Sequence, residues 1–377
     1  MTRSYLDHAS TSPARPEVVR TVTEWLARPA GDPGRIHAEG LEARVAVEVA
    51  REHVAGLFGA RPRSVVFTSG ATEAIAAACW GAAERGSHQV VAAVEHSAVR
   101  RAAAAHGAVT VVGVDGQGRI DPEALLAAVR PDTSLVHVQW GNHEVGTLQP
   151  VAQVVAACRE RGVLVHVDAA SANGRVPIAF DDLGADLLSV SAHKLGGPAG
   201  VGALLVRRGL RIRPLLVGGD QERARRAGLE PVPLIAGFGA AAEGLAAGGV
   251  EREAAEQRRL SQRILDAVPS LEGIVVYGDP VDRLPHLVCL GVAGVEPQAV
   301  LLGLDRAGVA AHSGSSCSSE SLEPSPVLEA MGVDAHHSLR LSVGWSSTDA
   351  DVDAALGALP EILEGLRALG GAPRTGR

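Results

Sequence analysis

Short apolar runs alternate with helical patterns over the first two thirds of the chain. The stretches after the runs carry the spacing of amphipathic or Ala-rich helices, as at 72 onward, 97–106 and 151–161. Continuous apolar strands separated by helices predict an α/β fold, with a parallel sheet covered by helices on both faces. The runs expected as strands are 65–68, 90–94, 135–139, 163–167, 187–190 and 203–206.

The pattern changes near Gly249. A charged helical stretch at 251–268 is followed by weaker strand patterns at 274–277 and 286–292. The length of 377 residues is too great for one ordinary core and suits two lobes. We therefore expect a large domain over 13–250, and a smaller α/β domain formed by 251–377 together with 1–12.

Composition narrows the class of protein. Apolar residues make up 46% of the chain, the formal net charge is -8, and no polybasic run is present, which disfavours direct nucleic-acid binding. The start, MTRSYLDHAS, lacks the apolar core of a signal peptide, and no apolar stretch approaches the roughly 18–20 residues of a membrane span. The expectation is a cytoplasmic protein without membrane contact.

One of the four cysteines stands apart. No CxxC pair is present, so the sequence predicts no metal site and no disulfide framework. Cys317 lies in the Gly- and Ser-rich stretch 312–325, HSGSSCSSESLEPS, whereas a structural cysteine usually lies in a core. One hypothesis is a thiol hydrolase built on Cys317 and His312. It leaves Lys194 and Asp168 without a role.

Polar residues follow the predicted strands, at the edge where parallel sheets bind ligands. Each has an ordinary interpretation: Thr72 and Asp168 as helix caps, His96 as a surface histidine, Lys194 as a solvated lysine. Together they supply a phosphate cradle, an imidazole, a carboxylate and an amine, which are the parts that hold pyridoxal phosphate (PLP). The segments concerned are 68–73, 95–96, 142–144, Asp168 and 191–194.

With these segments in their order along the chain, the sequence resembles the cysteine desulfurases of NifS/IscS type. These belong to the class V aminotransferase family of fold-type I PLP enzymes. The resemblance runs over nearly the whole chain and implies a large domain with a mainly parallel seven-stranded sheet covered by helices, plus a smaller α/β domain. Its motifs are YLDHASTSP near the start, FTSGATEA (67–74), EH (95–96), NHEVG (142–146), HVDAA (166–170), SAHKLGGPAGVGAL (191–204), GSSCSSESLEPSPVL (314–328) and SLRLSVG (338–344).

The resemblance implies a role for each matching residue. Lys194 would carry the cofactor and move the Cα proton of L-cysteine, and Asp168 would pair with the ring nitrogen. His96 would stack on the ring, and Arg340 and Asn142 would contact the substrate. Cys317 would attack the substrate sulfur and become a persulfide, leaving L-alanine. The phosphate would be held by Ala71, Thr72, Ser191 and His193.

Partners also follow from the resemblance. A homodimer is expected, with each site completed by the other subunit. The persulfide would pass to an acceptor protein, of which an iron–sulfur scaffold is one example. The sequence does not identify the acceptor.

Three positions depart from the family pattern. His143 stands where asparagine is common, Ser171 where glutamine reaches the ring hydroxyl of the cofactor, and Leu229 where a threonine reaches the neighbouring subunit's phosphate. His143 and Ser171 remain candidate cofactor contacts. Because of these departures, two alternatives stay open: a related PLP-dependent C–S or selenocysteine lyase, and a sulfur-relay partner of low activity.

Overall fold

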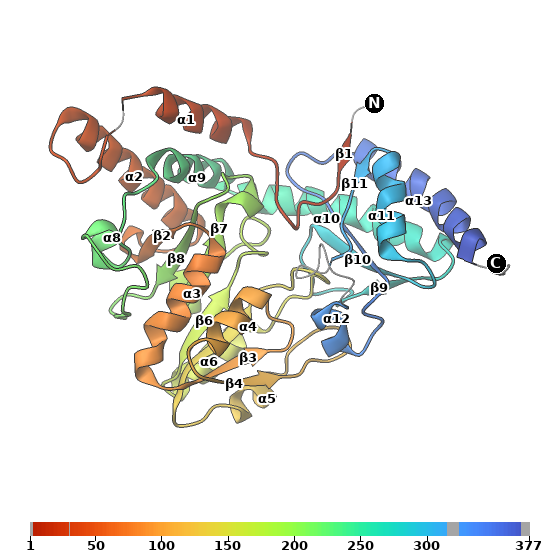
Figure 1. Cartoon of the computed structure of the whole chain (residues 1–377), viewed down its shortest axis with the longest axis horizontal. Helices are drawn as coiled ribbons and strands as arrows, with labels where there is room; N and C mark the ends of the chain where they lie inside the picture. The colour runs from red at the N-terminus through yellow and green to blue at the C-terminus, as the bar shows by residue number, and fades with distance from the viewer. Residues whose placement is uncertain (1–2, 30, 315–323, 371–377) are drawn as a thin grey trace, which may run out of the picture.

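The computed structural model describes residues 3–29, 31–314 and 324–370, and its centre is a seven-stranded sheet (Figure 1). The strand β8 is antiparallel to both of its neighbours, and every other pair in the sheet is parallel. The expectation of a mainly parallel seven-stranded sheet is therefore confirmed. In spatial order the strands are β2 (Val65–Thr68), β8 (Gly202–Val206), β7 (Leu187–Ser191), β6 (Leu164–Asp168), β5 (Thr133–Gln139), β3 (His88–Ala92) and β4 (Ala108–Val112).

Two features of the sheet were not predicted. The strand β4 lies at the edge beside β3, where most of its side chains are at least partly exposed. The reversal at β8 follows from its short link to β7, because antiparallel neighbours need no helical crossover. Local apolar patterns do not encode strand direction.

Helices cover both faces of this sheet, and the strand residues alternate between the two faces. Leu135 and Leu187 pack with Ala78 of α3, whereas Val136 and Leu188 belong to the core on the opposite face. Both faces are apolar, which explains the continuous hydrophobic runs in the sequence. The helices up to residue 245 are α1 (Pro16–Ala27), α2 (Ala38–Leu57), α3 (Ala71–Ala82), α4 (Ser97–Ala104), α5 (Pro122–Ala127), α6 (Val151–Glu160), α7 (Phe180–Leu183), α8 (Gln221–Ala224) and α9 (Val232–Leu245).

A second sheet and a second core lie toward the C-terminus (Figure 1). The antiparallel sheet has the order β12–β10–β9, and its core includes side chains of α10, α11 and α13. The bounds are α10 (Gly249–Ala267), β9 (Ile274–Tyr277), β10 (Leu287–Val292), α11 (Pro297–Arg306), α12 (Pro326–Met331), β12 (Ser338–Ser342) and α13 (Asp349–Gly370).

The N-terminal segment joins this second region. Strand β1 (Ser4–Tyr5) pairs in parallel with β11 (Val309–Ala310), and Leu6 belongs to the second core. Further along, Arg15 forms a mostly buried ion pair with Glu253 of α10, with the closest atoms 2.6 Å apart. The division of the chain at residue 250 stays a prediction.

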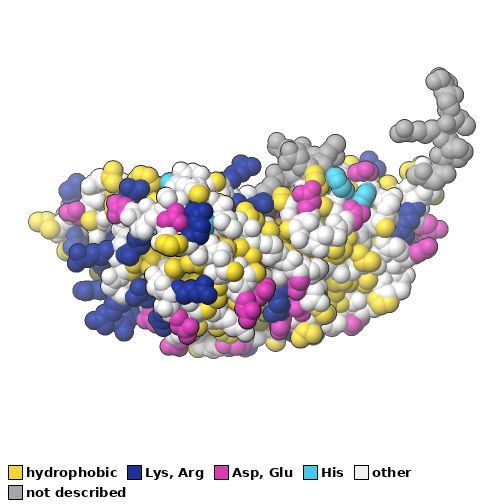
Figure 2. Space-filling view, turned by 90° about the horizontal axis from the view of Figure 1, so that it is seen from below, with side chains coloured by type: hydrophobic (Ala, Val, Ile, Leu, Met, Phe, Trp, Pro, Cys, Tyr) yellow, Lys and Arg dark blue, Asp and Glu magenta, His cyan; other side chains and the backbone are white. Residues whose placement is uncertain are grey.

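Charged side chains of both signs are scattered among apolar and other side chains on the face shown in Figure 2, and arginines are denser toward one end. Within the described ranges, no single helix is long and apolar enough to cross a membrane. The bent pair Val232–Leu245 and Gly249–Ser270, with a 76° angle, meets that test by length and composition only.

Candidate active site

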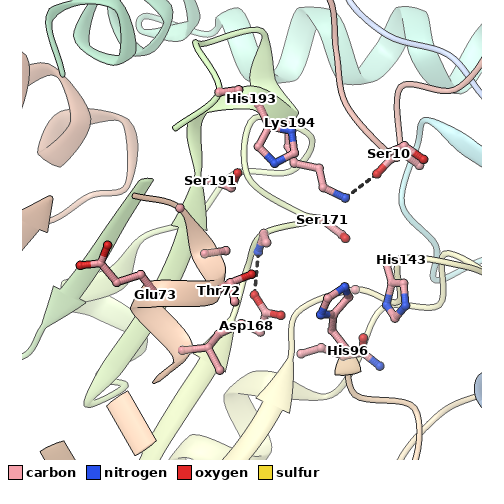
Figure 3. Close-up of a pocket in the computed structure, with 18 of the residues that line it drawn as sticks. Ser10, Thr72, Glu73, His96, His143, Asp168, Ser171, Ser191, His193 and Lys194 are labelled. Carbon is pink, nitrogen blue, oxygen red and sulfur yellow. Dashed lines mark hydrogen bonds between the residues drawn. The ribbon is translucent and has the colours of Figure 1, made fainter. Parts of the chain in front are cut away.

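A cavity of about 680 Å³ is lined by strand ends of the large sheet, the N-terminal segment and residues of the C-terminal region. Ten residues predicted from the sequence line it together, and Figure 3 labels most of them. Ser10 and His312 also line it, although sequence analysis gave neither of them a role in cofactor or substrate binding. The ten are Ala71, Thr72, His96, His143, Asp168, Ser171, Ser191, His193, Lys194 and Arg340.

Side-chain alternation explains why polar groups from separate strands meet here. Gln139, Asp168 and Ser191 end the strands β5, β6 and β7, and each lies four positions beyond a leucine that packs toward α3. An even spacing keeps a strand residue on the same face of the sheet. The three polar groups therefore share the α3 face at its carboxyl edge.

The start of α3 forms the anion-binding end of the cavity. The first N–H groups of a helix lack intrahelical acceptors and carry a partial positive charge, and no described side chain caps this terminus. The nearby Ser191 hydroxyl is buried and has no hydrogen-bond partner among the described residues. Glu73, in the first turn, is neutralised by Arg226 at 2.9 Å. This end of the cavity favours a phosphate-like group.

Glycines allow α3 to approach the sheet. Gly70 precedes the helix with a φ of 155°, and a Cβ on Gly202 would lie 2.7 Å from the Gly70 Cα. That distance is shorter than any ordinary carbon contact. A side chain at 202 would push the helix start away from the cavity.

Asp168 presents one carboxylate oxygen that the protein does not use. Its Oδ1 accepts hydrogen bonds from the Ala170 N–H and the Ser189 hydroxyl, both at 3.0 Å. No described residue donates to Oδ2. Asp168 is 8% exposed and lines the cavity, so Oδ2 is suited to a protonated ring nitrogen of a ligand.

Glu95 lies close to Asp168, and the sequence analysis placed it at this edge within 95–96 but gave it no role. Its Oε1 accepts from the Gln139 N–H at 2.7 Å, and its Oε2 is buried without a partner among the described residues. Burial, with a contribution from Asp168, raises the pKa of Glu95 to about 8. At pH 7 Glu95 is therefore mainly neutral.

Lys194 follows β7 in a short turn, and its amine donates to the Ala9 carbonyl. Its own backbone carbonyl accepts from the Ser12 hydroxyl at 3.0 Å and from Arg175 at 3.1 Å. Removal from water, and secondarily the nearby Arg340, lower the pKa of Lys194 to about 8. A larger fraction of neutral, nucleophilic amine is therefore present near neutral pH than for an ordinary lysine.

Lys194 is also the only lysine in the sequence, since every other basic residue of the Lys and Arg group is arginine. This count is a second sequence signal, independent of the motif around Lys194. Because this one lysine lies on the wall of the cavity, the residue count alone identifies the amine without any alignment.

His96 and His143 lie against each other, across the cavity from Lys194 in Figure 3. Their ring centres are 5.0 Å apart. The Nδ1 of His96 accepts from the Ala98 N–H at 3.1 Å and so caps α4. Burial, and secondarily His143, lower the pKa of His96 to about 4, so the ring is neutral at pH 7 with its proton on Nε2. His96 therefore enters the cavity as a hydrogen-bond donor.

Glu144 supports His143 from behind the cavity. The His143 Nε2 and Glu144 Oε1 are 3.5 Å apart, and the Ser325 hydroxyl donates to Glu144 Oε2 at 2.5 Å. Burial acts to raise the pKa of Glu144, but the bonds from His143 and Ser325 outweigh it and lower the pKa. Glu144 is ionised at neutral pH and orients His143.

Of the other two predicted residues, one is described away from the cavity wall and one lies outside the described residues. Asn142 does not line the cavity: its Oδ1 accepts from the N–H groups of Glu144 and Val145 at 2.8 Å, and its Nδ2 donates to the Val94 carbonyl. Its contact with substrate stays a prediction. Cys317 lies within 315–323, outside the described residues, and follows the cavity-lining His312 by five positions in sequence.

A lysine amine, a half-satisfied carboxylate and an open helix terminus around one cavity define a site for an anionic carbonyl compound. Among the described residues, no group of three or more His, Cys, Asp or Glu side chains could hold a metal ion. The Lys194 amine is placed to attack the carbonyl carbon of such a compound.

Comparisons with known proteins agree with this class. The Aminotransferase class-V family model matches residues 4–355. A cysteine desulfurase of Trichormus azollae is 41% identical over 97% of this chain and 94% of its own length. The solved structure of a NifS-like protein has a TM-score of 0.89 and 32% identity, covering 97% of this chain and all of that one. The structure titled SspA in complex with cysteine has a TM-score of 0.79 and 28% identity, over 92% and 100% of the two chains.

The chain belongs to the aminotransferase class-V family. Its relatives include proteins named cysteine desulfurase that match it over nearly their full length.

Proposed function

We propose that the protein is a PLP-dependent cysteine desulfurase, which converts L-cysteine to L-alanine and forms a persulfide on Cys317. The observation that carries the proposal is the meeting of Lys194, Asp168 and the open start of α3 on one cavity. The names of the relatives favour a desulfurase over a lyase of altered substrate or a sulfur-relay partner.

The residues present fit PLP. The buried and unpartnered Ser191 hydroxyl and the uncapped α3 terminus suit its phosphate, together with Ala71, Thr72 and His193. Asp168 Oδ2 suits the ring nitrogen, His96 the ring face, and Lys194 the carbonyl carbon. Ser171 and His143 line the same cavity and are the candidates for the ring hydroxyl. When bound, PLP supplies an electron sink that makes the substrate Cα proton acidic.

Three side chains of the protein would carry out proton transfer, carboxylate binding and attack on sulfur. The neutral Lys194 amine takes and returns protons at Cα, and Arg340 holds the substrate carboxylate. The Cys317 thiolate attacks the substrate sulfur, so that an S–S bond forms and the Cβ–S bond breaks. L-cysteine and one thiol become L-alanine and one persulfide, with no external oxidant or reductant.

The family also suggests a sulfur acceptor, an oligomeric state and a location in the cell. The persulfide would pass to an acceptor protein whose identity the chain does not reveal, and a homodimer with a cytoplasmic location is expected from the family. Leu229, at the position where relatives of this type commonly place a phosphate-contacting threonine, is 63% exposed on the described chain.

The test is formation of alanine and sulfide from L-cysteine with a thiol reductant, comparing the wild type with Cys317→Ala. The expected result is both products from the wild type and neither from the variant. Cys158→Ala is the matched control, because burial raises the pKa of Cys158 to about 11 and leaves it an inert thiol. Equal product formation by Cys317→Ala and wild type would remove Cys317 from the mechanism.

A further inference from the structure

The guanidinium of Arg340 is already engaged by groups of the protein itself. Its Nη1 donates to the His143 carbonyl at 2.7 Å. Its Nη2 donates to Asp7 Oδ1 at 3.0 Å and to the Ser10 hydroxyl at 2.7 Å. Arg340 is 2% exposed, so these bonds are made away from bulk water.

The bonds to Nη2 decide whether Arg340 can bind a carboxylate with two hydrogen bonds. A carboxylate is held bidentately by two parallel N–H bonds, either from Nε and Nη2 or from Nη1 and Nη2. Both pairs include Nη2, and both Nη2 hydrogens are used by Asp7 and Ser10. The Nε is buried without a partner among the described residues. A carboxylate that enters the cavity can be held bidentately only if Nη2 is released.

Asp7 and Ser10 act as one unit in this contact. The Ser10 hydroxyl donates to the same Asp7 Oδ1 at 2.8 Å, so Asp7, Ser10 and Arg340 Nη2 form a closed triangle. Ser10 lines the cavity, whereas Asp7 is not among the residues that line it. The unit therefore offers Arg340 a negative charge when no ligand carboxylate is present.

We propose that Asp7 is an internal competitor for the substrate carboxylate, and that Arg340 exchanges Asp7 for that carboxylate when an amino acid binds. The inference rests on the proposed function, which assigns Arg340 to the substrate. Because the exchange replaces one carboxylate by another, a ligand without a carboxylate does not drive it. The same competition weakens binding of the product amino acid and so favours its release.

The experiment measures binding, not turnover. The PLP-loaded protein is titrated with L-alanine and with L-alaninamide, which lacks the carboxylate, and the change in visible absorbance gives each dissociation constant. Asp7→Asn keeps the shape of the side chain and removes its charge. We expect it to bind L-alanine roughly tenfold more tightly, the equivalent of one charge-assisted hydrogen bond that no longer has to be displaced, and to bind L-alaninamide as the wild type does.

Two further variants sharpen the result. Asp305→Asn is the matched control, because it removes one carboxylate from an exposed pair with Arg3. Its L-alanine affinity is expected to equal that of the wild type. Ser10→Ala frees the other Nη2 hydrogen without a change of charge and is expected to tighten L-alanine binding by a smaller factor. It also provides the test if Asp7→Asn does not fold.

Failure of this inference is distinguishable from failure of the proposed function. If Arg340→Gln binds L-alanine as tightly as the wild type, the assignment of Arg340 to the substrate carboxylate is wrong. If Arg340→Gln loses affinity while Asp7→Asn and Ser10→Ala bind no more tightly than the wild type, the competition is wrong and the proposed function stands.

Discussion

The two walls of the cavity differ in how their polar groups are partnered. On the wall supplied by the large sheet, the Ser191 hydroxyl and the α3 terminus have no acceptor or donor among the described residues, and Asp168 keeps one oxygen unused. On the wall supplied by the N-terminal segment and β12, the Nη2 of Arg340 is saturated by Asp7 and Ser10. The sheet wall is ready for a ligand that stays, whereas the Arg340 wall must exchange partners each time a ligand enters and leaves.

This difference suits a resident cofactor and a transient substrate. Unsatisfied buried polar groups cost free energy until a ligand satisfies them, which strengthens binding of a permanent group. A site that is already paired binds its ligand less tightly, because the internal bonds must first be broken. Variants of Lys194 and Ser191 test the sheet wall, and variants of Asp7 and Ser10 test the Arg340 wall.

The largest effect is expected for Lys194→Ala. Since Lys194 is the only lysine, the variant has no side-chain amine left to bond to PLP. Borohydride reduction of the PLP-loaded protein followed by mass spectrometry is expected to show one added cofactor on the wild type, at Lys194, and none on the variant. Lys194→Arg, which retains the positive charge, serves as the control and is also expected to show none. A covalent adduct on either variant would refute the assignment.

A smaller effect is expected from pH. Because the pKa of Lys194 is lowered to about 8, the neutral amine that captures PLP increases about tenfold per pH unit below 8 and levels off above it. The rate at which the cofactor-free protein gains visible absorbance on mixing with PLP measures this. An increase that continues without a plateau to pH 10, as for a solvated lysine, would contradict the lowered pKa.

The smallest effect is expected for Ser191→Ala. The hydroxyl has no partner to lose in the cofactor-free protein, so the thermal midpoint of that form is expected to stay within about 2 °C of the wild-type value. PLP affinity is expected to fall about fivefold, the equivalent of one hydrogen bond near 1 kcal/mol. Ser189→Ala is the contrasting control, because its hydroxyl donates to Asp168 in the cofactor-free protein. A loss of stability without a loss of PLP affinity in Ser191→Ala would show that the hydroxyl is structural.

Much of the sheet wall could be predicted from local sequence. The apolar runs predict strands, and in a parallel sheet the residues that follow each strand meet at one edge, which brings Thr72, Asp168, Ser191 and Lys194 together. The same reasoning placed Glu95 at this edge but gave it no role, because burial and a neutral carboxyl group carry no sequence signature. It also missed β4 and the direction of β8.

The Arg340 wall could not be predicted in this way. Asp7, Ser10, the His143 carbonyl and Arg340 come from segments up to 333 positions apart. Sequence similarity assigned a role to Arg340, but no local pattern indicates that Asp7 occupies its Nη2. Likewise, the side chain of Asn142 is used by its own turn, although its position in the motif suggested a contact with substrate.

The sequence by itself determined the fold class, the order of the motifs and the single lysine, because hydrophobic periodicity and residue identity act locally along the chain. Only the tertiary structure decided which groups are saturated and which are open: the free oxygen of Asp168, the unpartnered Ser191, the proton position on His96 and the internal carboxylate on Arg340. The physical reason is that hydrogen-bond saturation and desolvation depend on neighbours in space, and the fold alone brings those neighbours together.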